Sequence, residues 1–181
     1  MDDLRDYSVK ETLKDGTVVT VRAVRPDDGG RIRKAFKGLD RETVYTRFFG
    51  YKSDVTEAEL GRITGVDFDR DVALLVTIAA GDAEIVIGGA SCFAIESDRP
   101  DGSGELAFTV EEDYQGLGIA SSLMRHLAQI AGEKGLSRLE ADVLASNLSM
   151  VTVFRRSGLP ITLRREDDVL HVTLSLQPSR Q

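Results

Sequence analysis

Two helical crossovers in the C-terminal half limit the kind of sheet that this chain can form. The β-rich segments ELAFTV (105–110) and RLEADVL (138–144) are predicted strands, and an apolar stripe predicts a helix between them over about 116–134. A second helix over 147–158 leads to a closing hairpin over 159–176. Because a helical crossover joins parallel strands, the sheet must contain some parallel pairing.

The N-terminal half contributes hairpins, which exclude a purely parallel, doubly wound sheet. Predicted strands flank the turn KDG within residues 7–24, and a second antiparallel pair is predicted within 71–96 around the turn GD. Three short helices are predicted between these pairs, and residues 97–104 (SDRPDGSG) have the composition of a loop. The expected architecture is a mixed sheet with helices on its faces.

Capping residues mark the starts of two of these short helices. Asp27 or Asp28, in the strand-ending RPDD, is predicted to cap the first helix with its side chain. Asp54 or Thr56 is predicted to cap the third helix in the same way.

Composition excludes several classes of protein. The 181 residues suit one domain, and a net charge of −7 argues against nucleic-acid binding while mildly favouring a cationic partner. The single Cys92 excludes an intramolecular disulfide and suits a reducing compartment. His126 and His171 are too far apart in sequence for metal-ligand spacing, so no metal is expected. The charged N-terminus and the absence of a long apolar run predict a cytoplasmic protein with no membrane partner.

The glycine-containing loop DYQGLGIASSLM (113–124) is the strongest motif for function. A nucleotide P-loop is excluded because no lysine follows either glycine, and a dinucleotide loop is disfavoured because Ser121 replaces its third glycine. The template Q-x-x-G-x-[GA] is matched in full by Gln115, Gly118 and Ala120. Backbone N–H groups at such a helix start bind phosphates, although the glycines alone are equally compatible with a simple helix entry.

The segments around this loop resemble the GNAT acyltransferase superfamily, which transfers acyl groups from acyl-CoA to amines. The resemblance is carried by GELAFTVEEDYQGLGIASSLM (104–124), NLSMVTVFRRSGL (147–159) and the opening TVRAVRPDD (20–28). It implies one α+β domain over residues 17–176, preceded by a strand extension (1–16) and followed by a tail (177–181). It also implies a mostly antiparallel twisted sheet with helices on both faces and a V-shaped splay between two parallel central strands.

The resemblance assigns a coenzyme A site to this part of the chain, with acetyl-CoA as co-substrate. Free backbone groups in the splay would pair with the pantetheine arm, and the loop before the second-half helix would hold the pyrophosphate. Asn147 matches an asparagine that hydrogen-bonds the arm, although an ordinary helix cap explains it nearly as well. The implied cofactor residues are Phe108, Thr109, Val110, Gln115, Gly116, Leu117, Gly118, Ile119, Ala120, Ser121, Asn147 and Phe154.

Glu105 is the candidate general base, because acyl transfer requires a neutral amine and a lysine amine has a pKa near 10.4. Strand alternation places Glu105 on one face with Ala107 and Thr109, whose small side chains leave room for an acyl group and an amine. The alternative interpretation is a solvated glutamate at a strand end.

One position departs from the family pattern. Many members have a tyrosine in the last helix that protonates the departing thiolate, and here Phe154 occupies that position and has no proton to donate. Tyr114 is a weaker candidate, and otherwise the thiolate leaves unassisted. Cys92 has no histidine nearby in sequence, which favours direct transfer in a ternary complex over an acyl-cysteine.

The N-terminal segments LKDGTVVTVRAVRPDD (13–28) and LDRETVYTRFF (39–49) resemble the GNAT domain of bacterial protein-lysine acetyltransferases. This resemblance implies a lysine acceptor on a metabolic protein such as an acyl-CoA synthetase. A small-molecule amine acetyltransferase and a non-catalytic acyl-CoA sensor are the alternatives. Monomer and homodimer both remain open.

Overall fold

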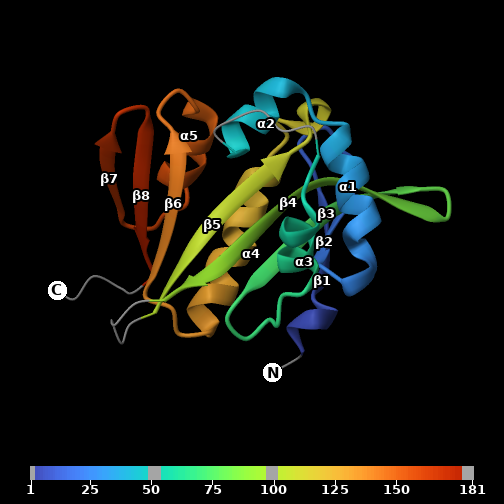
Figure 1. Cartoon of the computed structure of the whole chain (residues 1–181), viewed down its shortest axis with the longest axis horizontal. Coiled ribbons are helices and arrows are strands. Elements are labelled where there is room, and N and C mark those ends of the chain that lie inside the picture. The colour runs from blue at the N-terminus through green and yellow to red at the C-terminus, as the bar shows by residue number, and fades with distance from the viewer. Residues whose placement is uncertain (1–2, 49–53, 97–101, 177–181) are drawn as a thin grey trace.

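In the part of the chain that the structure describes, residues 3–48, 54–96 and 102–176, eight strands form one mixed sheet (Figure 1). The structure is a computed structural model, and for residues 45–48 it describes the backbone alone. The strands are Ser8–Thr12 (β1), Val18–Ala23 (β2), Val72–Ala80 (β3), Ala83–Ile95 (β4), Ser103–Val110 (β5), Arg138–Leu144 (β6), Ile161–Glu166 (β7) and Val169–Ser175 (β8). The α-helices are Gly29–Lys37 (α1), Arg41–Phe48 (α2), Glu57–Thr64 (α3), Ile119–Glu133 (α4) and Leu148–Arg155 (α5).

The strand order β1-β2-β3-β4-β5-β6-β8-β7 contains one parallel neighbour pair, β5 and β6, among the described strands. That pair is hydrogen-bonded only over Ser103–Glu105 on β5 and Arg138–Glu140 on β6. Beyond Glu105 the two strands diverge, as Figure 1 shows, while β6 stays paired with β8 on its other edge along its whole length. The predicted mixed sheet with a V-shaped splay between two parallel central strands is confirmed.

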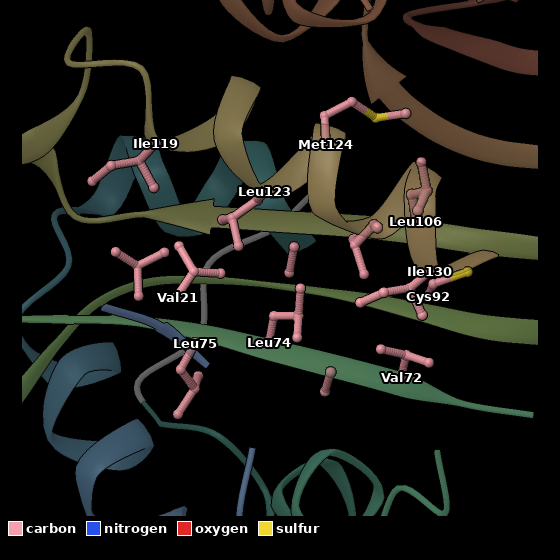
Figure 2. Packing of buried hydrophobic residues seen from close by; sticks show 14 of the residues in the cluster. Val21, Val72, Leu74, Leu75, Cys92, Leu106, Ile119, Leu123, Met124 and Ile130 are labelled. Carbon is pink, nitrogen blue, oxygen red and sulfur yellow. The ribbon is translucent and has the colours of Figure 1, made fainter. Parts of the chain in front are cut away.

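Helices cover both faces of this sheet because each strand alternates apolar side chains to either side. Leu123 and Ile130 of α4 point toward the sheet face that presents Leu74, whereas the neighbouring Leu75 points to the opposite face, beside α1 (Figure 2). All four side chains are buried, so the main core lies between α4 and the sheet and continues through β3 to the other side. A smaller apolar cluster packs α1 against α3. No helix in the described ranges is both long enough and apolar enough to cross a bilayer.

Most element predictions are confirmed, including the hairpins and the cap of α3. The Thr56 hydroxyl accepts the Glu59 N–H at 3.1 Å, and the Glu59 carboxylate accepts the Thr56 N–H in return. Two predicted element bounds need correction. Helix α4 begins at Ile119 rather than near Gly116, and β5 begins at Ser103, within the segment predicted as loop.

The prediction that Asp27 or Asp28 caps α1 with its side chain is wrong for Asp28, which occupies the N-cap position without making that bond. Its fully buried carboxylate instead accepts two hydrogen bonds of 2.8 Å from Arg22 of β2 and one of 2.6 Å from the Arg25 N–H. Arg22 also donates to Glu84 of β4 at 2.5 Å. This buried network joins β2, the turn before α1, and β4.

Candidate active site

A cleft of about 980 Å³ opens where β5 and β6 diverge. Its walls come from β5, β6, the start of α2, the loop before α4, and α5. A volume of this size is at the upper end of the range for ligand pockets. The edge of β5 that faces the gap has no partner strand beyond Glu105, so backbone groups on that edge between Leu106 and Thr109 are available to a ligand that carries amides.

Glu105 lies at the apex of the splay, on the last residue pair that joins β5 to β6. Its exposed side chain lines the cleft and has no hydrogen bond or ion pair with another described residue. The preceding Gly104 cannot carry a side chain, because a Cβ there would lie 2.4 Å from Cys92 Sγ. The absence of a side chain at Gly104 therefore leaves room for the Cys92 thiol beside β5, next to Glu105.

At the open end of the splay, the loop between β5 and α4 and the first residues of α4 line the cleft, and residues 115–121 are called the cradle below. Gly116 and Gly118 adopt φ of 79° and 97°, which directs the chain into α4 without a side-chain cap on its first turn. The Gln115 amide donates to the Val110 carbonyl at 3.0 Å and to the Thr43 hydroxyl of α2 at 3.2 Å. The uncapped N–H groups and the helix dipole suit an anion such as a pyrophosphate.

Replacing Gly118 with Val should weaken CoA binding by about tenfold or more, because a β-branched residue cannot adopt φ of 97° without distorting the cradle. Isothermal titration with CoA measures this loss. Gly135 is a matched control, since it has φ of 82° at the other end of α4 and does not line the cleft. Gly135→Val should lower thermal stability but retain CoA affinity, and equal affinity in both variants would contradict the assignment of the cradle.

Helix α5 forms the opposite wall of the cleft. The Asn147 side-chain oxygen accepts the Met150 N–H at 3.3 Å as an N-cap, which leaves its amide N–H₂ group free to donate into the cleft that Asn147 lines. Asn147 can therefore cap α5 and still hydrogen-bond the CoA arm, so the two interpretations from the sequence are compatible. The fully buried Phe154 ring packs edge-to-face on Phe108, with centroids 5.9 Å apart, and forms the floor of the cleft.

The residues predicted for the cofactor all line this cleft except Leu117. Leu117 is half-buried against the core, and its carbonyl accepts a hydrogen bond from Lys14. Sequence reasoning missed the contributions of Lys14, Asp142 and Arg156. A lysine in a turn and an aspartate in a strand carry no motif, so only the three-dimensional arrangement identifies them.

A second cavity, of about 320 Å³, lies on the α1 and α3 side of the sheet. It is mostly apolar and reaches Ala107 and Thr109, which share the face of β5 with Glu105. Arg62 of α3 stacks 4.1 Å from the ring centroid of Phe93 at its wall. The cavity can accept an aliphatic chain close to the apex of the splay.

Cys92 is unsuited to carrying an acyl group. Cys92 lies on β4, and its thiol is buried beside Gly104 of β5. Burial together with the nearby Asp71 charge raises the pKa of this thiol to about 12. Because the thiolate is the nucleophilic form, this cysteine is inert near neutral pH.

The segment YTRFF (45–49) ends the stretch LDRETVYTRFF that carries the resemblance to protein-lysine acetyltransferases, but the side chains of Tyr45 to Phe48, and all of Phe49, lie outside what the structure describes. The backbone of 45–48 completes α2, which begins beside the cleft.

Comparisons with known proteins agree with this geometry. A sequence model described as the Acetyltransferase (GNAT) family matches residues 41–159. An acetyltransferase of Pseudomonas aeruginosa is 32% identical over 140 residues, which cover 77% of this chain and 74% of that protein. Acetyltransferase Pat of Mycolicibacterium smegmatis is 30% identical over 92% of this chain, which spans 48% of Pat.

Among solved structures, the GNAT domain of S. lividans PAT superposes with a TM-score of 0.82 at 30% identity. The match covers 93% of this chain and 96% of that domain. Sequence, strand order and splay therefore lead to the same conclusion. The chain belongs to the acetyltransferase (GNAT) family and is an acetyl-CoA-dependent N-acetyltransferase.

Proposed function

We propose that this enzyme transfers an acetyl group directly to a primary amine, with Glu105 as general base and a protein lysine as the acceptor. Acetyl-CoA supplies the acyl group, which moves from sulfur to nitrogen as the CoA thiolate leaves. The observation that supports the proposal most strongly is the end of β5–β6 pairing at Glu105 and Glu140. Glu105 lies at that apex, and the five residues of β5 that follow it span about 16 Å before the chain turns toward the loop that would hold the pyrophosphate.

Glu105 would take one proton from the incoming ammonium, directly or through a water molecule. At neutral pH only about one lysine amine in a few thousand is uncharged, so this step controls the supply of nucleophile. The exposure of Glu105 and its freedom from other described partners leave its carboxylate available for that proton.

No side chain is required to protonate the leaving thiolate. Phe154 offers no proton, and Tyr114 lies beyond the far end of β5 from Glu105, near the cradle. A thiolate is a stable leaving group near neutral pH, because a thiol has a pKa of about 8.5. Water reaching the cleft can therefore supply the proton after the carbon–sulfur bond breaks.

Two features of the cleft support a lysine acceptor. Five acidic side chains line it, which favours the approach of a cation. The apolar cavity beside Ala107 and Thr109 suits the methylene arm of a lysine. The acidic residues are Asp40, Glu42, Glu105, Glu112 and Asp142.

The test is acetyl-lysine mass spectrometry of a bacterial lysate treated with enzyme and acetyl-CoA, with release of free thiol followed in parallel. Enzyme-dependent labelling of a limited set of lysines supports the proposal. The Glu105→Gln variant controls for non-enzymatic acetylation. Thiol release with small amines but without protein labelling would instead identify a small-molecule acceptor, and CoA binding without any turnover would identify a sensor.

A further inference from the structure

Lys14 lies in the turn between β1 and β2, outside residues 41–159 that match the family. Its side chain nevertheless lines the cleft between β5 and β6. The turn is well defined, because the Leu13 N–H donates to the Thr17 carbonyl at 2.8 Å and the Asp15 carboxylate accepts the Thr17 N–H at 3.0 Å. The N-terminal hairpin thus reaches the predicted cofactor site.

This turn docks directly on the anion cradle. The Lys14 N–H donates to the Leu117 carbonyl at 3.3 Å, and Lys14 Cε lies 3.6 Å from the point where a Cβ on Gly118 would be. The backbone bond fixes the Lys14 Cα beside the loop, and the side chain runs past Gly118 toward the start of α4.

A second set of contacts holds the hairpin in this position. The Glu11 carboxylate of β1 accepts a hydrogen bond from the Ser122 hydroxyl in the first turn of α4. It also pairs with Arg125 at 3.1 Å and with the largely buried His126 at 2.5 Å, one turn further along. These contacts connect β1, which leads into the turn that carries Lys14, to α4, which begins at the cradle.

Lys14 is one of two basic residues among the described residues that line a mostly acidic cleft. Among the described residues that line the cleft, Lys14 and Arg156 are the only cations, against five acidic side chains. A pyrophosphate entering such a site needs positive charge to offset the acidic surroundings. Arg156 follows α5 on the opposite wall, so Lys14 is the cation beside the cradle. Its exposed ammonium has no hydrogen bond or ion pair with another described residue.

We propose that the Lys14 ammonium binds the pyrophosphate of coenzyme A, so that the N-terminal hairpin is part of the cofactor site. This inference rests on the proposed use of the cradle for CoA. A lysine serves as a point charge for phosphate, whereas the backbone N–H groups of the loop supply directional hydrogen bonds. The two kinds of contact therefore act together on the same group.

Isothermal titration of CoA into Lys14→Gln tests the proposal, and thermal melting verifies that the variant is folded. The expected result is a dissociation constant about tenfold above that of the unaltered protein, with a smaller difference at high salt. Lys14→Arg should recover most of the affinity. Lys10→Gln is the matched control, because Lys10 is exposed on the same hairpin but does not line the cleft. It should bind CoA normally.

Truncated ligands identify the phosphate. The deficit of Lys14→Gln should persist with 3′-dephospho-CoA, which keeps the pyrophosphate, and should vanish with pantetheine, which has no phosphate. Normal CoA affinity in Lys14→Gln, or a deficit that disappears with 3′-dephospho-CoA, would overturn the proposal. If the unaltered protein did not bind CoA at all, the proposed function itself would fail, which is a distinguishable outcome.

Discussion

Glu105→Gln is expected to lower kcat about 10²- to 10⁴-fold while leaving CoA affinity within about twofold. Glutamine has nearly the same size and can fill the same space, but its amide cannot accept the proton from the ammonium. Because Glu105 lies at the apex, at the far end of the cleft from the cradle, the cofactor contacts are unaffected. Steady-state thiol release and CoA titration measure the two quantities separately.

The pH dependence of the variant gives an independent readout. Each pH unit below about 10 changes the neutral fraction of a lysine amine tenfold. Activity of Glu105→Gln should therefore rise steeply between pH 7 and 9, whereas the unaltered enzyme, in which Glu105 takes the proton from the bound ammonium, should depend less on pH over this range. Glu140→Gln is the control, since Glu140 is the pairing partner on β6 and does not line the cleft. An equal loss of kcat in Glu105→Gln and Glu140→Gln would contradict the assignment of Glu105 as general base.

Asp28→Ala is expected to destabilise the protein by about 3–5 kcal/mol, because it leaves the guanidinium of Arg22 buried without its main partner. The double variant Arg22→Met with Asp28→Leu should recover much of this loss, since it removes both buried charges. Urea denaturation followed by circular dichroism measures the free energy of unfolding.

The Arg33–Glu57 pair provides the matched control for this prediction. Its 2.5 Å contact is as short as that between Arg22 and Glu84, but the Glu57 side chain is 85% exposed. Glu57→Gln should therefore cost less than about 1 kcal/mol. A similar cost for Asp28→Ala would show that the buried network contributes no more than a surface pair.

Low pH should remove the stabilisation that the buried Asp28 carboxylate provides. Burial alone would raise the pKa of Asp28, but the hydrogen bonds from Arg22 and the Arg25 N–H outweigh burial and hold the pKa below its usual value. A carboxylate with a depressed pKa stabilises the folded state above its unfolded pKa of about 3.9. This contribution is lost as the pH falls below about 4 through the lower folded pKa, and the pH dependence should be weaker in the double variant.

Much of the site could be predicted from the sequence because its parts are local. Gln115, Gly118 and Ala120 belong to one loop, and the strand before it and Asn147 after it complete a pattern within 45 residues. The start of α4 could not be placed because the positive φ of Gly116 and Gly118 depends on the loop's path. Glycine allows that conformation but does not require it.

The remaining features depend on contacts between distant segments. Asp28 has the residue type of a helix cap, so its sequence position predicts a cap. Its ion pair with Arg22 depends on the three-dimensional arrangement of β2, β4 and the turn before α1, which also brings Glu84 to Arg22. Lys14 precedes Gly118 by 104 positions in the sequence. Hydrophobic periodicity predicts local elements only, so it could not predict that these two residues lie side by side. The residue at which β5 and β6 separate could not be predicted either. Each strand continues beyond that residue, so its own sequence does not mark where the pairing ends.

The unpaired edge of β5 has a consequence for the abundance of this enzyme in a cell. A strand edge without a partner is a surface on which other chains can pair and aggregate. Bound CoA would occupy that edge in the manner of an inserted strand, and if the proposed site is correct the ligand would also protect the fold. At a free concentration 100 times its dissociation constant, a ligand adds about 2.7 kcal/mol to the free energy of unfolding. Depletion of the acyl donor would then reduce the amount of intact enzyme as well as its rate, which couples protein lifetime to metabolic supply.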